Sequence, residues 1–457
     1  MTYLGYIMLP VGLAGLLLST KWLYRWFVFW TLFSASSVLN IGEGENGSAL
    51  QVWMFFGVLW LLRLTLEHLS TISFSIDRRI FRPCLWLAAF LFVGALSLVM
   101  PLYINGTLSI TSPFLLDGSE TPLYLTSHNF TQVLYLIFGG VITICVAHRN
   151  LRDAERQETE RLILLSAIFI SLWGLMQFIC SVVDIPYPYY IFNNSGSAAG
   201  TGFAQVLENV GISRISSAAV EPSIFAQSIV TLLPLTIPAW IGRGSVVSVP
   251  IDRLSTVLLA VALVLSTSST AYLGLLILAF LSVLMLAHTR TISIVRAGLV
   301  VGSALGAVSA LAVVAVYSSA IVRDVINSTL VDKATTYSGL ERVMTISLAY
   351  GYFLKFPLLG IGWGSAVSHD LIVLLLSNVG TIGALTFFGA MWCVVHSNWR
   401  IMDSLDSAMD LSRATWFLSF TVFLITSLFN GFPLAFGNFW LVMGMAISTS
   451  WKERLTT

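Results

Sequence analysis

Long apolar runs divide the sequence from end to end, and they constrain the fold more than any other feature. Apolar residues make up 57% of the 457 residues. A helix that crosses the hydrocarbon core of a bilayer needs about 20 mostly apolar residues, and in lipid such a run must satisfy its backbone hydrogen bonds as a helix. The runs lie at roughly 3–19, 24–40, 49–66, 84–103, 131–147, 162–182, 223–241, 254–267, 270–287, 297–317, 371–395, 414–430 and 435–450. We therefore predict an all-α, polytopic integral membrane helical bundle of about 12–14 transmembrane helices, forming a single membrane domain over residues 1–457.

The charge content excludes several classes of protein. Only 10% of the residues are charged, whereas ordinary soluble domains have about 25%, so neither a single-domain soluble enzyme nor a disordered chain fits. The 23 Lys and Arg against 22 Asp and Glu leave no basic excess for binding nucleic acid. The four cysteines (Cys84, Cys145, Cys180 and Cys393) are too widely spaced for a metal cluster. We predict no metal site and no cofactor.

The basic residues predict the orientation of the bundle. Most of the Lys and Arg fall on alternate loops, which the positive-inside rule assigns to the cytoplasm, and this puts the N-terminus outside and the C-terminus inside. The five that remain fall in two long outer segments, about 183–222 and about 318–370, and are Arg214, Arg323, Lys333, Arg342 and Lys355. These five could form salt bridges with neighbouring acids such as Glu208, Asp324, Asp332 and Glu341. We favour the alternative, which is that they bind an anionic ligand at the outer membrane face.

The first outer segment ends at Glu221-Pro222. Proline is favoured at the first position of a helix, so Glu221 is expected to cap the helix that follows, where the helix dipole stabilises a carboxylate. The functional alternative is a carboxylate at the mouth of a cavity, near Arg214. If residues 214–221 are helical, their spacing of seven puts both side chains on one face. Gln227 lies further along the same helix, below the surface.

The second outer segment has a helix, a glycine-rich turn and a histidine in succession. Residues 341–356 predict an interfacial or cavity-lining helix that ends at Pro357. The turn Leu358–Ser365 has three glycines at alternate positions, which permit positive φ and close approach of the backbone to a neighbour or ligand. His369 follows at the start of the next apolar run. A helix N-terminus disfavours imidazolium, so we expect His369 to be neutral and able to accept a proton, unless it serves only to cap the helix end.

A cluster of hydroxyl groups, Ser266-Thr267-Ser268-Ser269-Thr270, separates the apolar runs at 254–267 and 270–287 and is followed by Tyr272. We interpret it as a tight turn between two spans, with a broken helix as the alternative. The hydroxyls could line a polar pocket or satisfy the backbone groups of the turn.

Three of these stretches resemble the bacterial lipid-linked polysaccharide polymerases and O-antigen ligases. They are Arg214 through Glu221-Pro222-Ser223, the turn at 266–270, and the run from Ser338-Gly339-Leu340-Glu341-Arg342 through Pro357-Leu358-Leu359-Gly360-Ile361-Gly362-Trp363-Gly364 to His369 and Gly380-Thr381-Ile382-Gly383. In many members a Gly-x-Phe precedes the Glu-Pro, and in many ligases Asn follows the histidine. This chain has Ala218-Ala219-Val220 and Asp370 instead. The Glu-Pro-Ser resembles the polymerases more than the ligases.

The resemblance implies an integral membrane glycosyltransferase of the bacterial inner membrane. Its donor would be an oligosaccharide linked to undecaprenyl diphosphate, it would work at the periplasmic face among membrane lipids, and a partner protein that regulates chain length would fit the polymerases. A diphosphate leaves as a stable anion that guanidinium groups can hold by forked hydrogen bonds. Arg214 and Arg342 are our first candidates for this role, and Arg323, Lys333 and Lys355 follow. No acidic cluster suited to a divalent ion occurs in the outer segments, so we predict an inverting, metal-independent transfer.

The acceptor hydroxyl needs a base, and His369 and Glu221 are the two candidates. The predicted substrate pocket contains Gln227, Ser268, Tyr272, Gly362, Trp363 and Asp370. An O-antigen ligase acting on lipid A-core would use the same residues. A transporter or lipid-linked glycan flippase is the alternative of another class, but the polar residues lie at one face and we find no internal repeat.

Overall fold

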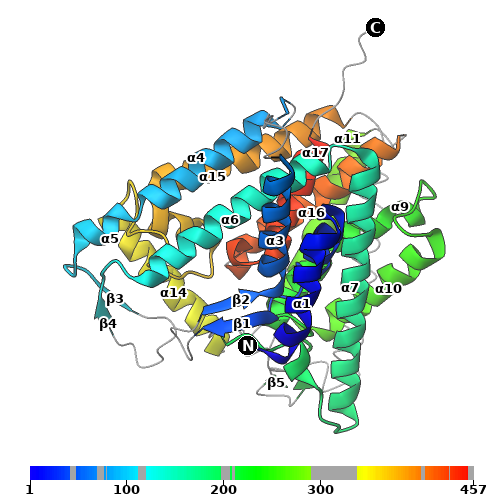
Figure 1. Ribbon diagram of the computed structural model, residues 1–457, viewed down its shortest axis with the longest axis horizontal. Coiled ribbons are helices and arrows are strands. Elements are labelled where there is room, and N and C mark those ends of the chain that lie inside the picture. The colour runs from blue at the N-terminus through cyan, green and yellow to red at the C-terminus, as the bar shows by residue number, and fades with distance from the viewer. Residues whose placement is uncertain are drawn as a thin grey trace.

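The computed structural model describes residues 1–41, 48–68, 77–78, 80–111, 120–196, 206–207, 212–289, 337–402, 407–431 and 433–450, which form a helical bundle with short antiparallel hairpins (Figure 1). The helices of these residues are α1 (Tyr3–Leu18), α2 (Thr20–Trp30), α3 (Val52–His68), α4 (Phe81–Leu96), α5 (Val99–Ile104), α6 (Ser127–Arg149), α7 (Asp153–Val182), α8 (Pro222–Leu232), α9 (Ile237–Trp240), α10 (Val249–Leu265), α11 (Ser269–His288), α14 (Tyr337–Lys355), α15 (Leu371–Ile401), α16 (Ala408–Asn430) and α17 (Gly437–Thr449). The hairpins pair β1 (Ser37–Ile41) with β2 (Ser48–Gln51), β3 (Ser109–Thr111) with β4 (Glu120–Pro122), and β5 (Val206–Leu207) with β6 (Ile212–Ser213).

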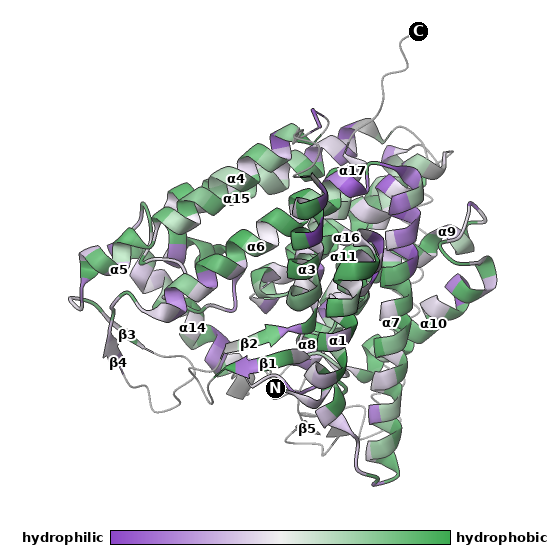
Figure 2. Ribbon diagram, viewed as in Figure 1, coloured by the Kyte–Doolittle hydropathy of each residue, from purple (hydrophilic) through white to green (hydrophobic). Residues whose placement is uncertain are grey.

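Among the described helices, seven are long and apolar enough to cross a membrane. They are Phe81–Ile104, Ser127–Arg149, Asp153–Val182, Pro222–Trp240, Ser269–His288, Leu371–Arg400 and Met409–Asn430. Figure 2 shows hydrophobic residues over most of their length, with hydrophilic residues gathered at the upper end of α7. The described residues therefore confirm a mostly helical chain with several helices that could cross a membrane, which fits a multi-pass membrane protein; seven such helices are described, against the predicted 12–14. The apolar run at 297–317 lies outside the described residues.

The predicted span at 24–40 is wrong. Helix α2 has only 11 residues, which gives about 16 Å of helix, and the chain then turns into the hairpin of β1 and β2. Serines at the end of the run explain the break, because they bond to a distant segment. Ser36 Oγ donates to the carbonyl of Phe192 at 2.6 Å, and the backbone N–H of Ser37 donates to Asn194 Oδ1 at 2.8 Å.

Helix α8 lies at the centre of the bundle, where it packs against α11 and α16, and all of its residues are buried. The chain continues through a 3₁₀ turn, Leu233–Thr236, into α9. Pro234 and Pro238 account for the interruption, because each lacks the N–H that a regular helix needs. Around this centre, α15 packs along α4, α17 along α6, and α2 along α3.

The turn at 266–268 separates two helices, α10 and α11, as predicted. Thr267 adopts a positive φ of 41° there, and α10 packs against α7 and α8 while α11 packs against α8 and α16. The predicted helix before Pro357 is also present, as α14, although it begins at Tyr337.

The alternating glycines serve the packing of the turn against α15. Gly360 has a φ of 66°, and a Cβ there would lie 2.5 Å from the carbonyl oxygen of Ser377. The opposing residue, Gly380, has a φ of 63° and kinks α15, and a Cβ on it would lie 2.2 Å from the carbonyl oxygen of Leu358. The N–H of Ile361 donates to the carbonyl of Ser377 at 2.8 Å across this contact. The glycines therefore allow two backbones to touch, and this contact fixes the start of α15.

Candidate functional site

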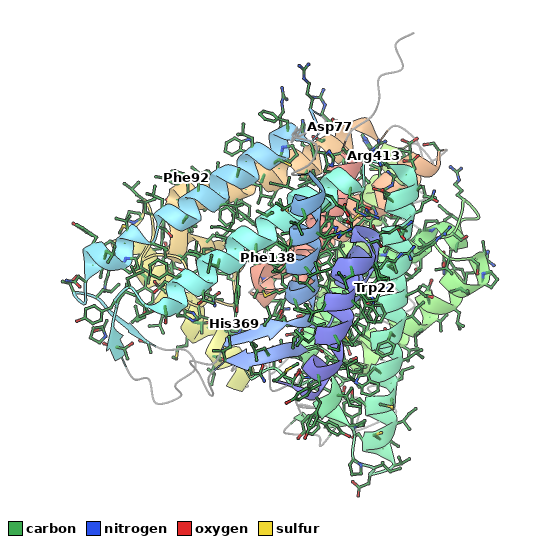
Figure 3. All side chains as sticks on the ribbon, viewed as in Figure 1. Trp22, Asp77, Phe92, Phe138, His369 and Arg413 are labelled. Carbon is green, nitrogen blue, oxygen red and sulfur yellow. The ribbon has the colours of Figure 1, made fainter. Side chains whose placement is uncertain are left out.

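The candidate site lies on one side of the bundle. Figure 3 shows His369 on the lower side, whereas Asp77 and Arg413 lie on the upper side. The segments that meet near His369 are the loop before α8, the turn before α11, the first turns of α14 and the C-terminal end of α16. Each reaches the site because a helix begins or ends there, and polar side chains bond to the backbone groups of these helix ends and loops.

Arg342 lies in the second turn of α14 and docks onto the C-terminus of α16. Its Nη1 donates to the carbonyl of Phe429 at 2.5 Å, and its Nη2 lies 3.4 Å from Asn430 Oδ1. A cation is favourable at this place because the last carbonyls of a helix carry partial negative charge. Nε of Arg342 is buried and makes no hydrogen bond among the described residues. Both hydrogen-bond partners are uncharged. Burial lowers the pKa of Arg342, and the nearby carboxylates of Glu221 and Glu341 oppose that shift.

A hollow of about 350 Å³ lies against this guanidinium, between α11, α14 and α16. It is lined by Ser269, Thr270, Tyr272, Leu273, Leu276, Arg342, Thr426 and Phe429. The polar side chains come mainly from the start of α11 and the apolar ones from further along α11 and from α16. The hollow therefore combines one cation, several hydroxyls and an apolar wall.

Arg214 lies in the loop before α8, within electrostatic reach of Arg342 and Tyr272, which line the hollow. The following residue, Ile215, donates its N–H to the carbonyl of Leu265 at 3.4 Å, which ties the Arg214 loop to the turn before α11. Burial lowers the pKa of Arg214, the charge of Arg342 lowers it further, and the carboxylate of Glu221 opposes both. An arginine remains protonated despite such a shift. These influences, together with that of Tyr272, show that Arg214 and Arg342 share one charged neighbourhood.

The loop between Arg214 and Glu221 is held by a buried glutamine of α7. Gln177 Oε1 accepts the N–H groups of Ser216 at 3.0 Å and of Ser217 at 2.8 Å. Ser217 has a positive φ of 55°, a conformation in which residues other than glycine are strained. This amide therefore holds the loop in an uncommon shape.

Two carboxylates lie near the two guanidiniums. Glu221 immediately precedes α8, with Pro222 at the first helical position as predicted, and its exposed carboxylate accepts a hydrogen bond from Ser223 Oγ at 3.0 Å. Burial, and then the negative charge of Glu221, raise the pKa of Glu341, while Arg342 lowers it. Glu221 and Arg342 thus each interact electrostatically with the other three charged groups of the site.

His369 lies in the turn before α15. Its Nδ1 is 3.0 Å from Thr345 Oγ1. Burial, and then the charge of Arg342, lower the pKa of His369 to about 4. The imidazole is therefore neutral at pH 7, as the sequence led us to expect. The causes are burial and a neighbouring guanidinium, whereas the sequence argument relied on the helix N-terminus.

Three further predicted pocket residues have structural partners. Asp370 caps α15, because its Oδ1 accepts the N–H of Val373 at 2.8 Å. Ser268 is buried and precedes α11, while its neighbours Ser269 and Thr270 line the hollow. Gln227 lies beneath the hollow.

The Gln227 amide belongs to a buried network that supports Arg342 from below. Its Nε2 donates to Thr426 Oγ1 at 3.1 Å and to Ser427 Oγ at 3.0 Å. Its Oε1 accepts from Asn430 Nδ2 at 3.2 Å, and Asn430 in turn contacts Arg342. In this structure Gln227 therefore orients the C-terminal end of α16.

The structure does not bring the remaining predicted residues to the hollow. Lys355 follows Arg342 by 13 residues in α14, which is about 20 Å along the helix. Gly362 packs against Pro101, and the ring of Trp363 packs against Phe90. Arg323 and Lys333 lie outside the described residues.

Sequence reasoning missed Gln177, Thr345 and Asn430. Gln177 left a signal, because an amide inside a long apolar run is costly to bury without a partner. Thr345 and Asn430 left none, because their importance depends on contacts with residues far away in the chain. The described residues contain no group of three His, Cys, Asp or Glu side chains that could hold a metal ion.

The sequence matches no known protein-family model, and comparison with well-characterised proteins gives no significant match.

Proposed function

We propose that this chain is a membrane glycosyltransferase, a polysaccharide polymerase that transfers a glycan from undecaprenyl diphosphate to the hydroxyl of an acceptor sugar. We assign the reaction to the periplasmic face of a bacterial inner membrane. Two arguments support this side. The basic residues of the loops predict that the Arg214 and Arg342 segments are outside, and His369 lies on the opposite side of the bundle from Arg413 (Figure 3).

The observation that carries the proposal is that two guanidiniums from distant segments lie within electrostatic reach of each other, one of them lining a hollow. Arg342 and Tyr272 both line the hollow, and both influence the pKa of Arg214. A diphosphate carries its non-bridging oxygens on two tetrahedral phosphorus atoms, so two forked guanidiniums can bind it together. The apolar residues Leu273, Leu276 and Phe429 would accompany the lipid part of such a donor.

The reaction needs a base and a leaving group. The acceptor O–H gives its proton to a ring nitrogen of His369 as its oxygen bonds to the anomeric carbon of the donor. The bond from that carbon to the phosphate oxygen breaks, and the electron pair leaves with undecaprenyl diphosphate, whose charge the guanidiniums stabilise. Attack opposite the leaving group inverts the anomeric carbon. Glu221, which is exposed beside Arg214, is the alternative base.

A polymerisation assay tests the proposal. Purified protein in lipid nanodiscs is given the lipid-linked repeat unit, and the products are separated on a gel. We expect a ladder of chain lengths, lost in Arg214→Ala and Arg342→Ala and kept in Arg152→Ala, whose side chain is 84% exposed on the loop before α7. Activity is expected to survive a chelator. A single transfer to lipid A-core without chain growth would indicate a ligase, and no transfer at all would refute the proposal.

A cellular assay separates the polymerase from a flippase. In cells that carry Arg342→Ala, an enzyme working outside would leave the lipid-linked unit accumulating at the periplasmic face. A flippase with the same substitution would trap the unit in the cytoplasmic leaflet. Accumulation inside would therefore contradict the proposed function.

A further inference from the structure

The contact between Thr345 and His369 links α14 to the turn before α15. Thr345 lies in α14 and is 1% exposed. Its Oγ1 is 3.0 Å from Nδ1 of His369 and 3.1 Å from the carbonyl oxygen of Arg342, three residues earlier in the helix. The Thr345 hydroxyl therefore contacts both the backbone carbonyl of Arg342, a predicted diphosphate-binding residue, and the ring of His369, the predicted base.

The protons of this bridge can be assigned. A threonine hydroxyl carries one proton, and a carbonyl oxygen carries none. The bond to the Arg342 carbonyl therefore uses the Thr345 proton, because two oxygens this close would otherwise repel. Toward His369 the same oxygen can only accept, so Nδ1 must carry the ring proton. In a neutral imidazole this leaves Nε2 as the nitrogen with the lone pair.

We propose that Thr345 is a positioning residue that holds His369 in the tautomer with the proton on Nδ1, so that Nε2 receives the proton of the acceptor hydroxyl. This inference rests on the proposed function and adds to it the choice between the two ring nitrogens. When Nε2 takes the proton, the Nδ1–H bond to Thr345 remains and helps to hold the imidazolium in place. No proton leaves through Thr345.

The surroundings restrict the ring from another side. Gly431, directly after α16, has a φ of 57°, and a Cβ on it would lie 2.8 Å from the Cα of His369. The backbone of His369 is thus packed against the end of α16, the helix whose C-terminus also holds Arg342. With its backbone fixed, a directional bond to the ring can select its tautomer.

The Thr345 hydroxyl could serve only to bond to the backbone of its own helix, and such a role would not involve His369. Thr386 in α15 makes the same kind of bond, from Oγ1 to the carbonyl of Gly383 at 2.8 Å, and it has no histidine partner among the described residues. Thr386→Val is therefore a matched control for the loss of such a bond. Thr345→Val removes the hydroxyl at nearly constant volume, and Thr345→Ser keeps it.

The test reads the tautomer directly. The protein is labelled with ¹⁵N-histidine in nanodiscs, and the signals of His369 are assigned among the six histidines by their loss in His369→Gln. Nitrogen shifts distinguish the two neutral tautomers without any substrate. We expect Nδ1–H in the native protein, Thr345→Ser and Thr386→Val, and a mixture of tautomers in Thr345→Val. We also expect kcat of Thr345→Val to fall about 10- to 100-fold with KM within about twofold.

Two results would overturn the inference. One is Nε2–H in the native protein, a reading that does not depend on any variant folding. The other is a Thr345→Val protein with the native tautomer and native kcat. Failure of the proposed function looks different, because the native protein would then extend no lipid-linked glycan, whatever tautomer His369 adopts.

Discussion

Replacing Arg342 with lysine separates the charge of this residue from its geometry. The substitution keeps one positive charge beside the hollow but replaces a planar fork of donors with a single ammonium group. In the structure, Nη1 bonds to the carbonyl of Phe429 at 2.5 Å, and Nη2 lies 3.4 Å from Asn430 Oδ1. A lysine can remain docked on α16 or turn toward a diphosphate, but it cannot do both.

The size of the effect follows from the bonds that are lost. The bond to Phe429 is short and charge-assisted, so we assign it about 1.5–3 kcal/mol. The contact with Asn430 is near the distance limit for a hydrogen bond and contributes little. Arg342→Lys therefore loses about one charge-assisted hydrogen bond, either to Phe429 or to the diphosphate. This corresponds to a fall in kcat/KM of roughly 10- to 150-fold. Arg342→Ala loses the charge as well and is expected to fall further, by about 10³-fold or more.

The assay is the single-turnover consumption of a radiolabelled lipid-linked repeat unit by purified protein in nanodiscs, with Arg152→Lys as the matched control. Thermal unfolding of each variant shows whether the bundle remains intact. Activity of Arg342→Lys within twofold of the native protein would refute the role assigned to the guanidinium fork. An equal loss of activity in Arg152→Lys would refute it as well.

Three other perturbations test separate parts of the structure. Because the pKa of His369 is lowered to about 4, the unfolded chain binds more protons than the folded one between about pH 6.5 and 4, so stability should fall as the pH falls through this window. Thermal unfolding at pH 7 and pH 4.5 should show a smaller acid loss in His369→Gln than in the native protein, and an equal loss would contradict the assigned burial. Gln177→Leu removes the side-chain oxygen that accepts two buried N–H groups, so it should cost about 1–3 kcal/mol of unfolding free energy and raise KM; unchanged values would show that Gln177 does not hold the loop. Gly380→Ala should sharply lower the unfolding temperature, because residue 380 has a positive φ and a Cβ there would clash with a carbonyl. Gly351→Ala should not, because a Cβ at residue 351 would have nothing within 4 Å. Similar effects of the two substitutions would argue against the tight contact at α15.

Hydropathy predicted the long helices because their length and composition are local properties. The runs predicted at 131–147 and 371–395 lie within α6 and α15, whose ends extend them by several residues. The failure at 24–40 also has a physical cause. Ser36 bonds to a carbonyl more than 150 residues away, and hydropathy has no means of anticipating such a partner.

The candidate site was predictable in its charges but not in its connections. The five basic residues of the two outer segments included Arg214 and Arg342, which the sequence analysis named as the first candidates for binding an anion. The end of α16 that holds Arg342, and the hydroxyl of Thr345 that holds His369, become visible only when helices distant in sequence are packed together. For the same reason the sequence could not show that Trp363 packs against Phe90 instead of facing the hollow.

The central claim is that Arg214 and Arg342 together hold a lipid-linked diphosphate. The most direct measurement is the affinity of purified protein in nanodiscs for undecaprenyl diphosphate, compared among the native protein, Arg214→Ala, Arg342→Ala, the double variant and Arg152→Ala. We predict that each site variant weakens binding at least about tenfold, in line with the loss of one charge-assisted contact, and that Arg152→Ala binds as the native protein does. Equal affinity in the native protein and the double variant would contradict the account.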